Sequence, residues 1–213
     1  METPNLTSEA TDTTRDRILL GAQQLFMRRG IKSVSMDDIT AALGISKKTL
    51  YKWFETKDHL VQAVINGHLG HTQGDCDRMA VEAENAVHEI VLMMKWSKQE
   101  HADVHPGIFL EMKKYHPAAY DCWQRHKFDY ILGTIERNLR RGIAEGLYRP
   151  EIDVPVMARL HLATIDIALD PDLFPPRQFT LARVMQVTDE AFLRSVIAPA
   201  GLNLLNRYLG LAA

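Results

Sequence analysis

The chain has 213 residues, 46% of them hydrophobic, which is enough apolar material for one compact unit or two closely packed ones. The formal net charge of −2 and the pI near 6.5 exclude a protein that is basic over its whole surface, so any nucleic-acid surface has to be local. Cys76 and Cys122 are the only cysteines and neither belongs to a C-x-x-C pattern, which argues against a disulfide scaffold and a zinc ribbon.

The N-terminal residues 1–13 are polar and rich in threonine, and they predict a flexible arm with little to bury. They have neither the basic start nor the apolar run of a signal peptide. No later stretch approaches the roughly 20 apolar residues of a membrane helix. We therefore expect a cytoplasmic protein with no membrane partner.

Three helices are predicted within residues 14–66. The first is amphipathic and ends at Gly30. The second begins directly after Ser35, which is a natural N-cap, because Asp38 three residues later completes a variant of the capping box. It ends at Gly44, and Ser46 caps the third helix. Two short helices joined by about three residues that include a glycine indicate a helix-turn-helix.

The third helix, residues 47–54, has two faces. Leu50 and Phe54 point inward at a spacing of one turn, while lysines and a tyrosine point outward and suit a DNA major groove. Lys57 and the N-terminus of the following helix can hold a phosphate. An ordinary solvated face is the alternative. The predicted DNA-binding residues are Ser35, Lys47, Lys48, Thr49, Tyr51, Lys52, Trp53 and Lys57.

These segments together resemble the DNA-binding domain of the TetR family of transcriptional regulators. The resemblance covers residues 14–66 and is carried by RDRILLGAQQLFMRRG, VSMDDITAALGISKK and TLYKWFETKDHL. It implies an all-α homodimer in which residues 67–213 bind a small effector and thereby release double-stranded DNA at a palindromic operator. Asp37 and Asp38 stand where some members have a base-reading cation, so we expect base reading to depend on the third helix alone.

The connector between the two predicted domains is a helix from Lys57 to about Leu69. Gly67, Gly70 and Gly74 weaken its far end, since each glycine costs roughly 1 kcal/mol relative to alanine inside a helix. A flexible junction and an ordinary helix end are both compatible with this pattern. Further helices are predicted at about 78–102, 107–114, 117–145, 154–169, 180–198 and 201–209.

The second domain contains no recognisable enzyme motif. The histidine pairs His101/His105 and His68/His71 have no nearby cysteine or carboxylate set at the spacing of metal ligands. We therefore predict neither catalysis nor a metal or cofactor. Aromatic and methionine side chains suit an effector pocket, although a plain core is the alternative. The candidate pocket residues are Trp96, Phe109, Met112, Trp123, Tyr130, His161, Ile165 and Asp166.

Apolar stripes on the last two long helices predict a twofold dimer interface, with burial inside the monomer as the alternative. The candidate interface residues are Val156, Leu160, Ala163, Val184, Val187, Ala191 and Phe192. The function predicted from the whole sequence is a homodimeric repressor that a lipophilic or aromatic effector releases from its operator. A helical enzyme with a vestigial DNA-binding domain and an architectural DNA binder without an effector are the alternatives.

Overall fold

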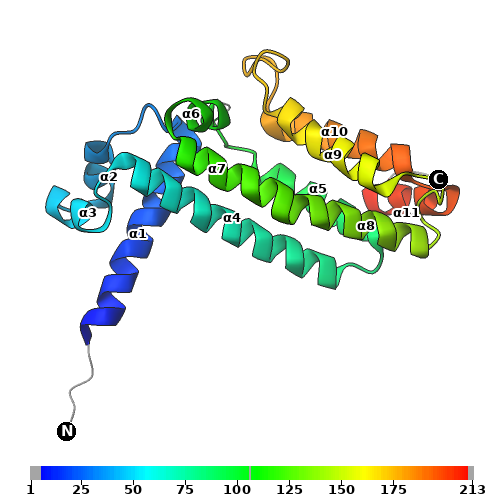
Figure 1. Cartoon of the computed structure of the whole chain (residues 1–213), viewed down its shortest axis with the longest axis horizontal. Helices are drawn as coiled ribbons and strands as arrows, with labels where there is room; N and C mark the ends of the chain where they lie inside the picture. Colours follow the sequence, from blue (N-terminus) through cyan, green and yellow to red (C-terminus); the bar gives the residue numbers. More distant parts are fainter. Residues whose placement is uncertain (1–5, 106, 211–213) are drawn as a thin grey trace, which may run out of the picture. The chain divides into compact units, whose positions relative to one another are not determined.

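The structure is a computed structural model that describes residues 6–105 and 107–210 (Figure 1). The predicted all-α fold is confirmed, because these residues contain helices and no β-strand. The helices are α1 Leu6–Arg29, α2 Met36–Leu43, α3 Lys47–Trp53, α4 Lys57–Glu82, α5 Ala86–Glu100, α6 Ile108–Tyr115, α7 Pro117–His126, the π-helix η1 Lys127–Ile131, α8 Leu132–Ala144, α9 Val154–Ala168, α10 Leu181–Val196 and α11 Pro199–Leu209.

Two compact units make up the chain. Unit 1 consists of residues up to Gly70 together with Gly107–Trp123, and unit 2 consists of His71–Pro106 and the residues from Gln124 onward. Helices α4 and α7 each contribute to both units. Residues 107–123 were predicted to belong to the second domain, whereas their contacts group them with the N-terminal helices.

Helix α1 begins at Leu6, earlier than the predicted start at residue 14. Residues 6–13 contain no glycine or proline, so nothing in them interrupts the helix. Residues 6–13, which were predicted to be part of the arm, thus lie in α1, and residues 1–5 lie outside the described part of the chain.

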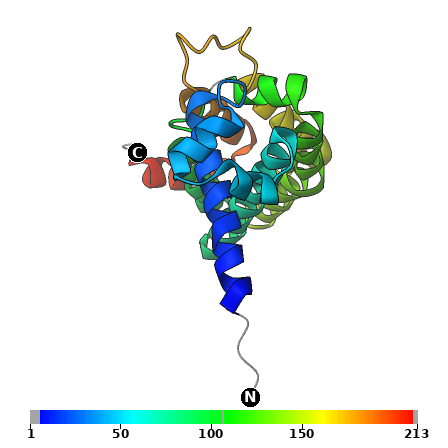
Figure 2. The same ribbon diagram turned by 90° about the vertical axis from the view of Figure 1, so that its left-hand side faces the viewer.

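The core of unit 1 lies where α1, α2, α3 and the start of α4 meet. Figure 2 shows the short helices α2 and α3 beside the longer α1, and α2 packs on both of its neighbours. Leu50 and Phe54 are buried as predicted, so the opposite face of α3 is turned to solvent. The other buried side chains of this core include Ile18, Ala22, Phe26, Ile39, Leu60, Val61 and Val64.

Helix α4 continues without a break from Lys57 to Glu82, so the three glycines do not end it. The chain instead breaks at residues 83–85, and Asn85 caps α5 by accepting a hydrogen bond from the backbone N–H of His88 at 2.9 Å. The predicted single helix 78–102 is therefore wrong, because a local side-chain cap separates the end of α4 from α5.

Unit 2 is built around α5, which packs on α8, α10 and α11. Its core includes Tyr148, whose hydroxyl group donates to Asn138 Oδ1 at 3.0 Å and lies 3.1 Å from the carbonyl oxygen of Ala86. The predicted helix 117–145 is present, but the π-helical turn η1 interrupts its α-helical hydrogen bonding.

Candidate DNA-binding surface

Helix α2 is fixed at both ends by local interactions. The backbone N–H of Asp38 donates to Ser35 Oγ at 3.1 Å, and the backbone N–H of Ser35 donates to Asp38 Oδ2 at 2.8 Å, so the predicted capping box is formed. Hydrogen bonds from the side chain and backbone of Ser35 lower the pKa of the Asp38 carboxyl group. Gly44 has φ of 63°, the left-handed conformation that glycine adopts most easily, and so ends the helix at the predicted turn.

Helix α3 starts at a second cap, where the backbone N–H of Thr49 donates to Ser46 Oγ at 3.1 Å. Its outward face is the one predicted for DNA, because Lys47, Lys48, Tyr51 and Lys52 are all exposed. We call these four residues the α3 face. A basic, exposed helix face held by a buried Leu50 is suited to enter a major groove.

The other residues predicted to bind DNA have additional roles. The hydroxyl group of Ser35 donates to Asp38 Oδ2 at 2.6 Å, and the hydroxyl group of Thr49 lies 2.8 Å from that of Ser46, so both take part in caps. Trp53 is half-buried, and the Lys52 ammonium group lies 5.6 Å from the centre of its indole ring. This contact holds Lys52 along the surface of α3.

An ion pair that the sequence analysis did not predict joins α2 to α3. Lys47 Nζ lies 2.8 Å from Asp37 Oδ2, and both side chains are more than half exposed. The hydrogen bond to Asp37 raises the pKa of Lys47. Asp37 therefore positions the first lysine of the α3 face.

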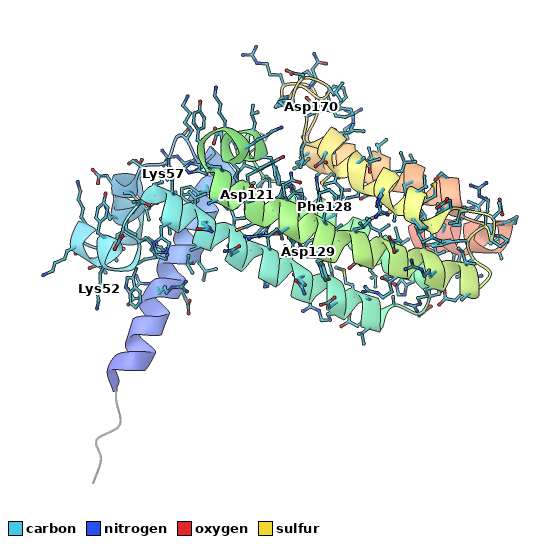
Figure 3. All side chains as sticks on the ribbon, viewed as in Figure 1. Lys52, Lys57, Asp121, Phe128, Asp129 and Asp170 are labelled. Atoms are coloured by element: carbon cyan, nitrogen blue, oxygen red, sulfur yellow. The ribbon has the colours of Figure 1, made fainter. Side chains whose placement is uncertain are left out.

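Lys57 lies in the first turn of α4, where the hydroxyl group of Thr56 accepts a hydrogen bond from the backbone N–H of His59 at 3.1 Å. The Lys57 ammonium group donates to the carbonyl oxygen of Ile31 at 2.6 Å, and partial burial lowers its pKa. Figure 3 labels Lys57 at the beginning of α4 and Lys52 on α3. Lys57 therefore fastens α4 to the turn after α1 and also adds positive charge at a helix N-terminus.

Two further contacts, also missed by the sequence analysis, attach residues 107–123 to the DNA-binding helices. His116 Nδ1 lies 2.6 Å from Asp58 Oδ1, and the backbone N–H of Lys32 donates to Glu111 Oε2 at 2.9 Å. The partners are 58 and 79 residues apart in the sequence. No local pattern signals such pairs, so the sequence alone offered no route to them.

The match to known proteins coincides with the capped helices described above. Residues 18–64 match the profile of the family described as "Bacterial regulatory proteins, tetR family". The helix-turn-helix part of the chain is therefore similar to that of TetR-family transcriptional regulators.

Curated relatives of this chain include two long matches. An uncharacterised HTH-type transcriptional regulator of Bacillus subtilis, YvaF, is 26% identical over 189 residues, which cover 85% of this chain and 95% of YvaF. The HTH-type transcriptional repressor KstR2 of Mycolicibacterium smegmatis is 25% identical over 154 residues, covering 68% of this chain and 72% of KstR2.

Solved structures share the fold over most of the chain. A TetR-family regulator from Agrobacterium tumefaciens matches with a TM-score of 0.73 and 18% identity, covering 88% of this chain and all of the other. A regulator from Saccharomonospora viridis in complex with choline matches with a TM-score of 0.69 and 22% identity, covering 90% and 100%. FadR from Bacillus subtilis in complex with stearoyl-CoA matches with a TM-score of 0.65 and 16% identity, covering 84% and 97%.

The eight predicted pocket residues are divided between the two units. Phe109, Met112 and Trp123 belong to unit 1, where the rings of Phe109 and Trp123 meet edge to face with centroids 5.4 Å apart and Met112 is buried. The other five are Trp96, Tyr130, His161, Ile165 and Asp166, and they belong to unit 2.

In unit 2, the polar members of the predicted pocket have separate partners. Both carboxylate oxygens of Asp166 accept hydrogen bonds from Lys127 Nζ, at 2.8 and 2.7 Å, and the imidazole of His161 stacks on Phe192 with centroids 3.9 Å apart. A hollow beside the loop between α9 and α10 is lined by residues between Ala168 and Val184. None of the eight predicted pocket residues lines this hollow. The effector pocket therefore stays a prediction.

The predicted dimer residues fall into two groups. Val156, Leu160, Ala163, Val187 and Ala191 are exposed on α9 and α10. The two exceptions are Val184 and Phe192.

Val184 and Phe192 are 5% and 8% exposed, so their assignment to a surface between subunits is corrected. Phe192 belongs to the core of unit 2, which uses the inward face of α10. The five exposed residues remain candidates for a contact with a second subunit.

Neither a metal site nor a membrane helix is found in the described ranges. No group of three or more histidine, cysteine, aspartate or glutamate side chains within residues 6–105 and 107–210 is arranged to hold a metal ion. No helix in the same ranges is long and apolar enough to cross a membrane.

Proposed function

We propose that this protein is a homodimeric repressor of the TetR family that acts in the cytoplasm, binds a palindromic operator through α3, and leaves it when a small organic effector binds the helical part of the chain. The observation that carries this proposal is the α3 face, with exposed lysines and a tyrosine on a helix held by two caps and a glycine turn. Lys47, Lys48 and Lys52 supply the local positive charge that a chain with a net charge of −2 needs to bind DNA.

Each side chain has a distinct proposed role at the operator. Lysines on the α3 face donate to guanine edges or phosphates, and Tyr51 donates to a phosphate or packs on a thymine methyl group. Lys57 and the N-terminus of α4 bind a phosphate. Ser35, Thr49 and Trp53 lie at the caps and at the side of α3, where they reach the sugar-phosphate backbone.

Dimerisation is supported by the exposed apolar residues of α9 and α10. Leu160 is 55% exposed and Val187 is 62% exposed, and Val156 and Ala163 lie at helical spacing on the same face as Leu160. A twofold axis along this face would bury the same side chains in both subunits. It would also present two copies of α3 to the two half-sites of a palindrome.

A Leu160→Ala variant tests the interface. Burial of the exposed half of a leucine contributes roughly 1 kcal/mol per subunit and about 2 kcal/mol per dimer, so the dissociation constant of the dimer should rise about 30-fold. Analytical ultracentrifugation measures this change. Leu110→Ala is the matched control, because Leu110 is 50% exposed on α6 and lies outside the proposed interface. Equal weakening in both variants would count against the interface.

An organic effector is supported by solved relatives of the same fold. One was crystallised with choline and another with stearoyl-CoA, so the fold accommodates chemically different small molecules. Repression is supported by KstR2, which is named a transcriptional repressor. The curated relatives are regulators, which supports a role without catalysis.

DNA binding is tested by selecting fragments of the organism's genomic DNA with the full-length protein and measuring affinity for the enriched sequence. A Lys48→Met variant should bind the selected operator about tenfold or more weakly, because it loses a contact to DNA in each subunit. Lys98→Met removes the same charge from an exposed position of α5 and should bind as the wild type does. Unchanged affinity of Lys48→Met at fixed salt would contradict the proposed role of α3.

A further inference from the structure

The interior of unit 2 holds a carboxylate that is only half satisfied. Glu89 of α5 is 1% exposed, and its Oε2 accepts a hydrogen bond from Arg141 Nη1 at 3.2 Å. Its Oε1 is buried and has no hydrogen-bond partner among the described residues. Since buried polar atoms are almost always paired, an unpaired carboxylate oxygen marks a place for a donor.

The positive charge next to Glu89 is already shared. Arg141 also donates through Nε to Glu145 Oε1 at 2.8 Å and through Nη2 to the carbonyl oxygen of Ala83 at 2.9 Å. Arg137 Nη2 is 3.9 Å from Glu89 Oε1, which is too far for a hydrogen bond, and the Arg137 side chain is 51% exposed. An exposed arginine at this distance is held weakly and can turn outward.

The neighbouring part of α4 adds negative charge. Burial, and after it the adjacent carboxylates of Asp75 and Asp77, raise the pKa of the Cys76 thiol to about 11, so the thiol stays protonated and neutral. The hydroxyl group of Tyr130 donates to Asp77 Oδ1 at 2.7 Å. The groups around Glu89 therefore favour a positively charged donor over an anion.

We propose that Glu89 binds the protonated nitrogen of an amine effector, which donates an N–H to Oε1 while Arg137 turns outward. This inference rests on the proposed function, since it names the chemical class of the effector. A primary or secondary ammonium group satisfies the orphan oxygen and neutralises its charge, and a carboxylate or phosphate in the same place would be repelled.

Three probes of one shape test the charge preference. They are 2-phenylethylamine, 2-phenylethanol and phenylacetate, which are cationic, neutral and anionic at pH 7, and their binding to the full-length protein is measured by calorimetry. The amine should bind more tightly than the alcohol, and phenylacetate should bind weakest. Phenylacetate binding as tightly as the amine would overturn the proposal, as would the absence of measurable binding by the amine.

Substitutions of Glu89 and Arg137 should change the affinity for the amine in opposite directions. Glu89→Gln keeps the shape but removes the charge, so the amine should bind about ten- to hundredfold more weakly. Arg137→Gln removes the competing cation, so the amine should bind more tightly. The second variant keeps the test decisive if Glu89→Gln does not fold. Glu82→Gln is the control for loss of a carboxylate, because Glu82 is exposed on α4.

Two results would assign Glu89 a structural role alone. One is equal amine affinity in the wild type, Glu89→Gln and Arg137→Gln. The other is a Glu89→Gln variant that melts at a higher temperature and still binds the amine, as expected if only a buried water serves Oε1. Operator binding without any probe is measured in parallel. If the operator binds and the amine does not, the inference fails while the DNA-binding function stands.

Discussion

The most informative substitution in unit 1 is Lys57→Met, because Lys57 has two possible roles. Its ammonium group donates to the carbonyl oxygen of Ile31 within the protein, and it also lies at the N-terminus of α4, where a DNA phosphate would bind. Methionine keeps the unbranched stem and removes only the charge and its hydrogen bonds.

The magnitude of the effect on DNA binding follows from the number of phosphates. One phosphate contact per subunit makes two per dimer, and each contributes about −0.9 to the slope of log affinity against log salt concentration. The variant's slope should therefore be less steep by about 1.8. Between about 50 and about 200 mM salt, the ratio of wild-type to variant affinity should shrink about tenfold.

The effect on folding should be small. The carbonyl oxygen of Ile31 also accepts a hydrogen bond from the backbone N–H of Val34 at 3.3 Å, so it keeps a partner in the variant. A loss of roughly 1 kcal/mol corresponds to a fall of about 2–4 °C in melting temperature for a chain of this length.

The assay is fluorescence anisotropy on a labelled operator at several salt concentrations, combined with a thermal melt, and Lys98→Met is the control for net charge. Lys98→Met should leave both the slope and the melting temperature as in the wild type. A Lys57→Met variant with a lower melting temperature and the wild-type salt slope would refute the phosphate contact and leave Lys57 with its internal role alone.

Two further substitutions probe unit 2. In Gly142→Ala, the added methyl group would overlap the buried ring of Tyr148, so the free energy of unfolding measured in urea should fall by about 1–3 kcal/mol or more, and an unchanged value would contradict this packing. Burial raises the pKa of Asp189 to about 7 and lowers the pKa of His161 to about 4. Between about pH 4 and 6.5 each state of the protein therefore holds one proton at this pair, on Asp189 when the chain is folded and on His161 when it is unfolded. Unfolding then takes up no proton at this pair, whereas in Asp189→Asn the unfolded state binds one more proton than the folded state. The stability of the variant relative to the wild type should therefore rise by about 3 kcal/mol over that range, and a constant difference would show that the His161 pKa is not lowered.

Several features of the DNA-binding helices could be predicted from the sequence, because neighbouring residues determine them. The cap at Ser35, the turn at Gly44 and the cap at Ser46 depend on contacts three or four residues apart. The inward positions of Leu50 and Phe54 follow from helical periodicity, and both are buried. The same short-range rules explain why the residues of the α3 face were correctly predicted to point outward.

Tertiary structure decided how these helices are held and which apolar faces are covered. Lys47 pairs with Asp37, and His116 pairs with Asp58, through contacts that no local pattern encodes. The sequence pattern of the apolar stripe on α10 does not distinguish packing inside the subunit from packing against a second subunit. Only the fold showed that Phe192 is buried.

The same distinction applies to Glu89. Its position in the sequence is that of an ordinary charged residue on an amphipathic helix, and the packing of α5 on α8 is what removes it from water and leaves one oxygen without a donor. The sequence by itself determined the caps of α2 and α3, the turn between them and the inward positions of α3, because these depend on residues within about one turn of each other. The ion pairs and buried charges were determined only by tertiary structure, because their energies depend on which distant side chains come together and how much water remains between them.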